Sequence, residues 1–137
     1  MYGTADKLLT TIGFQATAMQ GTMEDDDWGD VLETVLTDIS AVIDGMISSR
    51  YDVSDYADNA VLERIALSVG RYDMYCQYVR NDVPETIRKD KEEAFKMLND
   101  IQSGKLALTP DTPDEDAPAP VESEFTSSAQ VFSQVLL

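Results

Sequence analysis

The carboxylates between positions 24 and 38 are the residues of this sequence best suited to chemistry, because their density suggests a calcium loop. They are Glu24, Asp25, Asp26, Asp27, Asp30, Glu33 and Asp38. A calcium loop needs oxygen ligands at positions one, three and five, a glycine at six and a glutamate at twelve. Counting from Glu24 places Trp28 at five and Val35 at twelve. The pattern therefore favours the solvated start of a helix, where carboxylates suit the helix dipole, and we predict no metal site.

The sequence lacks the residues that usually perform nucleophilic catalysis. The 137 residues include no histidine and one cysteine, Cys76. This composition excludes Cys–His and Ser–His–Asp nucleophiles, Cys/His zinc sites and a disulfide framework. Paired carboxylates do acid–base chemistry in glycosidases, but nothing else in the sequence resembles a sugar cleft. We therefore expect a protein that is not an enzyme and binds no cofactor.

Negative charge dominates the chain and is unevenly placed. Asp and Glu number 26 against 10 Lys and Arg, for a net charge of −16, which disfavours nucleic-acid binding through a basic surface. Residues 1–63 hold 13 acidic and 2 basic residues, residues 64–105 hold 7 and 8, and residues 106–137 hold 6 and none. Unlike halves favour head-to-tail association. The candidate subunit-interface residues are Asp30, Glu33 and Asp38 on one side and Arg64, Arg71, Tyr75 and Tyr78 on the other.

Three tyrosines at spacing three lie on one predicted helix, so they turn gradually around it and cannot all lie in the core. They are Tyr72, Tyr75 and Tyr78. One interpretation buries Tyr72 and leaves Tyr75 and Tyr78 partly exposed. The other makes them a subunit contact, because aromatic residues are enriched at interfaces. Both interpretations stay open.

The elements that position these residues are helices, because apolar residues recur with helical spacing along residues 1–105. We predict an all-α, small four-helix bundle with one short and three longer helices, at 4–12, 28–49, 59–80 and 84–103. The second helix has a stripe formed by Val31, Leu32, Val35, Leu36, Ile39, Val42, Ile43, Met46 and Ile47. The predicted core comprises Leu36, Ile39, Ile43, Leu62, Ile65, Val69, Phe95 and Leu98.

Capping signals support these helices. The predicted N-terminal signals are Thr4, Asp26 or Asp27, Asp58 or Asn59, and the pair Asp82 and Glu85. Gly104 is the predicted left-handed residue after the last helix. Cys76 falls on the predicted core side of the third, and we expect it to be a buried small hydrophobic residue.

We predict that the helical body comprises residues 1–108 and that the C-terminal part of the chain is a separate extension. Residues 109–124 are acidic and proline-rich, a composition that cannot bury enough surface to fold alone. Residues 125–137 are uncharged and carry six large apolar side chains: Phe125, Val131, Phe132, Val135, Leu136 and Leu137. This segment either folds back onto its own body or docks on another chain, and we favour docking.

No membrane span is predicted. The longest uncharged stretch, residues 8–23, is interrupted by Thr, Gln and Gly and falls short of the roughly 20 apolar residues that a bilayer needs. We expect a soluble protein in a reducing cytoplasm.

Several short motifs stand in a recognisable order: Met1-Tyr2-Gly3-Thr4, Asp44-Gly45, Arg50-Tyr51, Arg71-Tyr72 with Tyr75, and Gly104-Lys105-Leu106. With them, residues 1–108 resemble head-completion proteins of Mu-like phages and prophages, and Val131-Phe132-Ser133 is weakly similar. Two stretches depart from that family's pattern. Residues 52–59 replace an expected proline-containing segment, and the acidic linker at 110–124 is longer than expected.

The resemblance implies the head-to-tail adaptor of tailed phages, a structural virion protein. In that family the subunits form a ring, usually of twelve, beneath the portal protein, and an extended C-terminal segment grips the portal. The implied partners are further copies of the chain, the portal, and a tail stopper, terminator or other neck protein. DNA would pass through the ring without sequence-specific binding, and an acidic channel would repel its phosphates. The expected location is the neck of the virion, with the host cytoplasm during assembly.

Two other classes of function fit part of the sequence. One is an acidic helical inhibitor or DNA mimic that acts by protein–protein binding, and the other is a regulatory helical module whose tail binds one partner. A mimic should spread its carboxylates at about phosphate spacing, whereas here they are concentrated at 24–38 and 111–124. The native mass of the protein discriminates between these classes of function, because a dodecamer favours the adaptor and a monomer or dimer favours either alternative.

Overall fold

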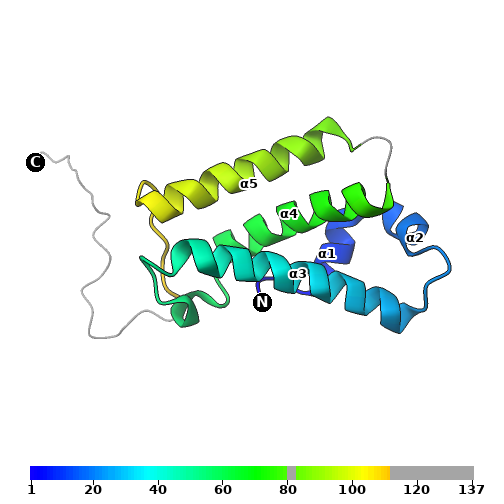
Figure 1. The fold of residues 1–137 in the computed structure, drawn as a ribbon, viewed down its shortest axis with the longest axis horizontal. Helices are drawn as coiled ribbons and strands as arrows, with labels where there is room; N and C mark the ends of the chain where they lie inside the picture. The colour runs from blue at the N-terminus through cyan, green and yellow to red at the C-terminus, as the bar shows by residue number, and fades with distance from the viewer. Residues whose placement is uncertain (80–82, 112–137) are drawn as a thin grey trace, which may run out of the picture.

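The computed structural model describes residues 1–79 and 83–111, and in this part of the chain the regular structure is entirely helical. The elements are α1 (Ala5–Ile12), α2 (Gln15–Gln20), α3 (Asp25–Ile47), the 3-10 helix η1 (Val53–Tyr56), α4 (Ala60–Tyr78) and α5 (Glu85–Ser103). Figure 1 shows α3, α4 and α5 side by side, with α2 at one end of the bundle and η1 at the other. The predicted all-α bundle is confirmed.

Helix α4 is the centre of the bundle, since α1, α3 and α5 each pack against it. Its side chains Leu62, Ile65 and Ala66 are at most 1 % exposed. The approach of α1 is closest at Gly70, where an added Cβ atom would lie 3.2 Å from Cδ1 of Leu8. A residue without a side chain therefore lets α1 pack directly on the α4 backbone.

Three helix ends follow the predicted signals. The Thr4 hydroxyl oxygen accepts a hydrogen bond from the Lys7 amide, and the Asn59 side-chain oxygen accepts from the first amides of α4. Gly104 closes α5 in the left-handed conformation at φ 89°, which glycine adopts without strain. Asp82, the other predicted capping residue of α5, lies outside the described residues.

The start of α3 differs from the prediction. The helix begins at Asp25 rather than at residue 28, and it ends at Ile47 rather than at residue 49. Its N-cap residue is Glu24, whose side chain makes no capping hydrogen bond, so the prediction of Asp26 or Asp27 as N-cap is wrong. These aspartates lie in the first turn instead, where the helix dipole favours negative charge.

Two short helices were not predicted. Helix α2 is six residues long, has no side-chain cap, and is bounded by Gly13 and Gly21, both with positive φ. Ala16 and Met19, three residues apart, turn its inner side to the core. The 3-10 helix η1 is capped by Asp52, whose carboxylate accepts from the amide two residues later. Both elements are too short for hydrophobic periodicity to reveal.

The core is largely as predicted. Residues at most 7 % exposed include Leu36, Ile39, Ile43, Leu62, Ile65, Val69 and Leu98. Phe95 is only partly buried and Cys76 is exposed, so these two predictions of burial are wrong. Val42, a member of the predicted stripe, is 52 % exposed. Val42 lines the side of α3 that borders a groove between α3 and α5, and no other side chain of the described residues covers it. In the last turn of α4, Tyr75 rather than Cys76 is turned to the core.

Candidate functional site

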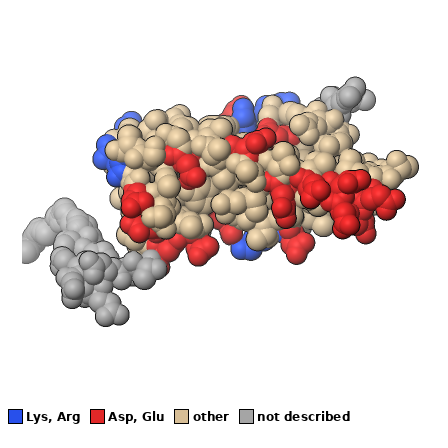
Figure 2. Space-filling model, turned by 60° about the horizontal axis from the view of Figure 1, so that its bottom comes forward, with Lys and Arg blue, Asp and Glu red and all other residues tan. Residues whose placement is uncertain are grey.

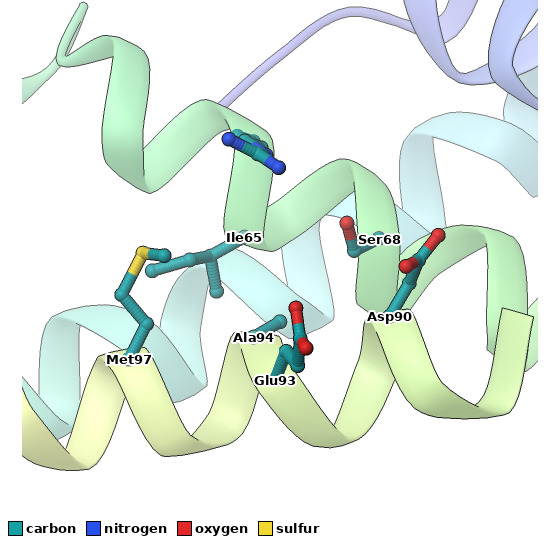
Figure 3. A pocket seen from close by; sticks show the side chains of 7 residues that line it. Ile65, Ser68, Asp90, Glu93, Ala94 and Met97 are labelled. Carbon is teal, nitrogen blue, oxygen red and sulfur yellow. The ribbon is translucent and has the colours of Figure 1, made fainter. Parts of the chain in front are cut away.

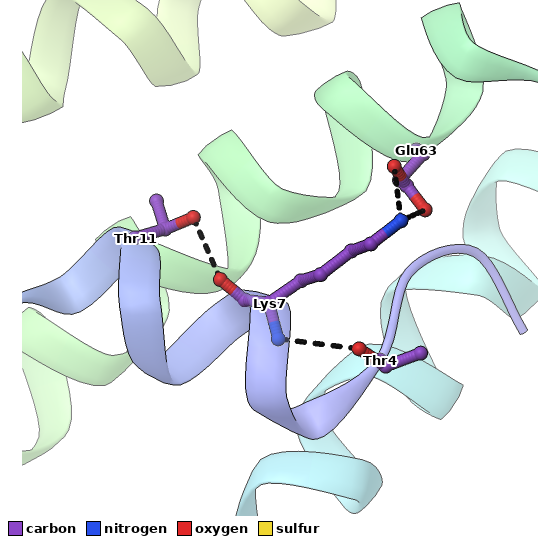
Figure 4. Close-up of polar contacts among 4 residues, drawn as sticks. All are labelled: Thr4, Lys7, Thr11 and Glu63. Carbon is purple, nitrogen blue, oxygen red and sulfur yellow. Dashed lines mark hydrogen bonds and ion pairs between the residues drawn. The ribbon is translucent and has the colours of Figure 1, made fainter.

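The N-terminus is fixed to α3 through Tyr2. Its amide donates to Oγ of Ser40 at 2.8 Å, and its phenol donates to the carboxylate of Asp44. Burial, together with the hydrogen bond to Asp44, raises the pKa of the phenol. Figure 4 shows a second attachment, in which Nζ of Lys7 lies 2.9 Å from the carboxylate of Glu63 on α4. These contacts hold residues 2–7 against α3 and α4.

Arg50 joins the loop after α3 to the end of α5. Its Nε donates to the main-chain carbonyl of Gln102 at 3.2 Å, and its guanidinium lies where a Cβ atom on Gly104 would come within 3.0 Å. A positive charge at the C-terminal end of a helix interacts favourably with the helix dipole. Asp44, Arg50 and Gly104, which carry part of the family resemblance, therefore take part in contacts that hold the bundle together.

Residues 105–111, which we call the tail root, pack over η1 and the start of α4. Leu108 is 8 % exposed, and its amide donates to the phenol oxygen of Tyr51 at 3.2 Å. Nδ2 of Asn59 donates to the carbonyl of Thr109 at 3.0 Å, and the amide of residue 111 donates to an η1 carbonyl at 2.9 Å. The first residues of the predicted linker therefore contact the body. The rest of the linker and all six predicted docking residues lie outside the described residues.

A small cleft of about 100 Å³ separates part of α4 from α5. Figure 3 shows Ser68 of α4 facing the side of α5 that carries Asp90 and Glu93, and Arg64 completes the polar lining. The volume is below the roughly 300–1,000 Å³ of typical small-molecule sites. Within residues 1–79 and 83–111, no three cysteine, aspartate or glutamate side chains are grouped to hold a metal ion.

Helix α3 provides an acidic surface. It carries seven carboxylates and no lysine or arginine, and Figure 2 shows acidic residues gathered at the end of the body where α3 begins. The three predicted interface residues of this helix, Asp30, Glu33 and Asp38, are all exposed. This end of the bundle is opposite the tail root (Figure 1).

The predicted interface residues of α4 are in different environments. Arg64 is exposed, whereas Arg71 is paired with Asp90 of α5. Tyr75 is 7 % exposed and therefore unable to contact another subunit, and Tyr78 packs edge-on against Trp28 at 5.9 Å between ring centroids. The interpretation that left Tyr75 partly exposed is wrong. Of the four, Arg64 is the one whose charge is both exposed and outside the ion pairs of the described residues.

Two apolar surface features were missed by sequence reasoning. The first is a groove of about 380 Å³ between α3 and α5, which we call the α3–α5 groove and whose apolar lining includes Ile39, Val42 and Phe95. The second is Phe14, which is 89 % exposed in the turn between α1 and α2. The one feature of the sequence that could have indicated an exposed Phe14 is its position beside Gly13 in an uncharged stretch. No feature of the sequence could have predicted the groove, because its width depends on how far α5 lies from α3.

A family model described as Bacteriophage Mu, Gp36 matches residues 2–127, which is most of the chain. The chain belongs to the Bacteriophage Mu Gp36 family. Membership in the Gp36 family confirms the prediction of a Mu-like phage protein. No significant match is found among curated proteins or solved structures.

The Gp36 match reaches beyond the helical body. It continues through the tail root and the predicted linker and ends two residues after Phe125. The matched residues therefore include the acidic, proline-rich segment. None of the helices in the described part of the chain is long and apolar enough to cross a membrane.

Proposed function

We propose that this chain is a structural virion protein, a head-completion protein that forms a head-to-tail adaptor ring beneath the phage portal. Membership in the Gp36 family carries the proposal, because it supports a phage structural or assembly protein. The resemblance of residues 1–108 to head-completion proteins narrows this to the neck of the virion. In this role the chain needs neither a catalytic group nor a cofactor, and it is recruited from the host cytoplasm during assembly.

The two ends of the helical body suit two different partners. The tail root lies at one end of the bundle and the acidic start of α3 at the other (Figures 1 and 2). In the proposed arrangement, the chain leaves the body at the tail root, and residues 125–137 grip the portal. Fully extended, residues 112–137 reach up to about 85 Å. The body then receives the stopper, terminator or other next component of the neck.

Lateral contacts in the ring, which has twelve subunits in the proposed arrangement, join unlike surfaces of neighbouring copies. The exposed carboxylates of α3 form one surface, and the other includes the exposed guanidinium of Arg64 on α4, at the cleft between α4 and α5. Unlike surfaces generate head-to-tail contacts that can close into a ring, and opposite charges fix the register of such contacts. The net charge of −16 suits a channel through which DNA slides, because phosphates are repelled by carboxylates.

Inactivating the gene in its phage or prophage tests the proposal. We expect DNA-filled heads and complete tails to accumulate unjoined, heads to lose DNA on storage, and a plasmid copy of the gene to restore infectious particles. Wild-type heads made without tails are the control, and they should contain the protein. Infectious particles at normal yield without the protein would overturn the proposal. Isolation of the protein as a monomer bound to a nucleic-acid enzyme would instead favour the inhibitor or DNA mimic.

A further inference from the structure

Phe14 is the most exposed large apolar side chain of the described residues. It is 89 % exposed, whereas Ala16 and Met19 of the adjoining helix α2 are buried. No charged residue occurs between positions 8 and 23, although 26 % of the chain is charged. An aromatic residue in an uncharged stretch of sequence has the composition typical of an interface centre.

The α3–α5 groove is a receptor of matching chemistry on the same chain. Ile39 and Val69 form its buried floor, and Val42, Tyr72 and Phe95 remain partly or largely exposed along it. The groove therefore offers an apolar surface that this chain leaves uncovered within the described residues. An aromatic ring placed there would contact aliphatic and aromatic carbon on three sides.

The charges around the two features are complementary. Lys91 of α5 lies 4.9 Å from the ring centroid of Tyr72, and Arg88 is close enough to that ring to act on it electrostatically. Neither cation is in an ion pair within the described residues. Around Phe14, the side-chain amide of Gln20 donates to Asp25 at 2.8 Å, which places α2 beside the acidic start of α3. The lining also includes the carboxylates of Asp38 on α3 and Asp73 on α4, and Lys91 acts electrostatically on Asp73.

We infer that Phe14 of one copy docks in the α3–α5 groove of a second copy. The two features lie on different parts of the chain, and in a head-to-tail arrangement each contact leaves one free Phe14 and one free groove for further copies. A buried phenylalanine supplies roughly 150–250 Å², whereas a specific interface needs about 1,000 Å² in total. Contacts between the acidic start of α3 and the α5 cations supply part of the remainder. The inference rests on the proposed function only in assigning this contact to the sides of the ring.

Disulfide trapping in the purified full-length protein tests the contact directly. Cys76→Ser removes the exposed native thiol, and Gln15→Cys and Val42→Cys are then introduced in separate batches. We expect a disulfide-linked dimer when the two batches are mixed and oxidised, and background levels with either batch alone. The matched control mixes Gln15→Cys with Val61→Cys, since Val61 is also an exposed valine, at 36 %, but does not line the groove. Equal trapping in both mixtures overturns the inference.

Truncation of the aromatic ring tests its energetic role. Because Phe14 makes little contact with its own chain, Phe14→Ala should leave the circular dichroism spectrum and melting temperature unchanged. We expect it to weaken self-association, measured by analytical ultracentrifugation, by at least about tenfold, whereas Val61→Ala should change it less than twofold. A wild-type protein that stays monomeric at millimolar concentration, or a Phe14→Ala variant that associates normally, overturns the inference.

The alternative occupant of the groove, which the test must distinguish from a second copy, is the chain's own C-terminal segment. A chain carrying both Val42→Cys and Phe132→Cys distinguishes it: an intramolecular disulfide that forms at high dilution would place that segment in the groove and overturn the inference. The trapping experiment and the gene inactivation test different claims, so their results can be distinguished. Trapping between copies with no defect in head–tail joining would retain the contact and refute the adaptor role, and the reverse result would refute the contact alone.

Discussion

The main-chain amide of Leu108 donates a hydrogen bond to the phenol oxygen of Tyr51 across 3.2 Å. This bond links the tail root to the loop that follows α3, and the Asn59 side chain adds a second link by donating to Thr109. The chain therefore leaves the body from a fixed place, although no regular element extends beyond α5 in the described residues. A fixed origin limits where residues further along the chain can reach.

Asn59→Ala should both destabilise the body and release the tail root. The side-chain oxygen accepts from the amides of Val61 and Leu62 at 2.9 and 3.1 Å, and loss of such an N-cap costs about 0.5–2 kcal/mol. Urea unfolding measures this loss. Brief trypsin treatment measures the release, because cleavage after the exposed Lys105 should accelerate when the tail root detaches.

Asn59→Asp is the matched control for the two roles of this side chain. The carboxylate can still accept from the first amides of α4, but it cannot donate to the Thr109 carbonyl. We expect stability closer to wild type together with faster cleavage after Lys105. Unchanged cleavage in both variants would show that the tail root is held by other contacts.

Two helical glycines should respond oppositely to a larger side chain. An added Cβ at Gly45 would meet nothing within 4 Å, so Gly45→Ala should stabilise the protein by about 0.5–1 kcal/mol through helix propensity alone. At Gly70 the space is occupied by Leu8, and Gly70→Val should destabilise by about 1–3 kcal/mol through overpacking. Thermal unfolding followed by circular dichroism measures both. Stabilisation by Gly70→Val would contradict the described packing of α1 on α4.

The comparison of sequence and structure shows what periodicity can and cannot predict. The stripe of α3 correctly placed Leu36, Ile39 and Ile43 in the core, because a helix must bury its most apolar side. It wrongly included Val42, because the width of a buried stripe depends on how closely the neighbouring helices approach. For the same reason the aromatic ring of Phe95 was assigned to the core although it borders the α3–α5 groove.

The interface candidates show the same limit for charged and aromatic residues. Composition identified an acidic half and a mixed half, and the exposed carboxylates of α3 agree with that division. Composition could not indicate that Arg71 is paired with Asp90 or that Tyr75 is buried, since both depend on contacts between helices. Phe14 was missed because an isolated aromatic residue in an uncharged stretch has the same sequence signature whether it is buried or exposed.

Asp73→Asn should raise the melting temperature at pH 7 and have no effect at pH 3. Burial raises the pKa of the Asp73 carboxyl above its ordinary value of 3.8, and Lys91 offsets part of this increase. A raised pKa in the folded state means that ionisation opposes folding, so stability falls as the pH rises from 3.8 through the folded-state value. The neutral amide avoids this cost at pH 7, and below pH 3.8 both side chains are uncharged. Asp38→Asn, at an exposed position on the same groove, is the control, and an equal effect of the two substitutions would contradict the role of burial.

Arg64→Glu should impair assembly without unfolding the subunit. Arg64 is exposed and outside the ion pairs of the described residues, so reversing its charge leaves the body intact but repels an acidic neighbour. We expect fewer copies per head, and we expect wild-type assembly to weaken with added salt because exposed charges are screened beyond about 8–10 Å. Lys7→Glu is the control: it removes the surface pair with Glu63, worth about 0.2–1 kcal/mol, on the side occupied by α1. Equal loss of incorporation in the two variants would argue against a charge-patterned lateral contact.

Deletion of residues 121–137 separates the adaptor proposal from its alternatives most sharply. The deletion removes Val121 and the six large apolar side chains of residues 125–137, and it leaves the tail root and every described contact of the body intact, so helicity and melting temperature should not change. If this segment grips the portal, burial of Phe125, Phe132 and Leu136 contributes roughly 1.5–3 kcal/mol each, less the cost of ordering the chain. Repetition around a ring multiplies even a weak contact through effective concentration. Purified heads should therefore lack the truncated protein and leak DNA, as measured by quantitative mass spectrometry and nuclease sensitivity. Full occupancy of heads by the truncated protein would move the portal contact from this segment to the helices.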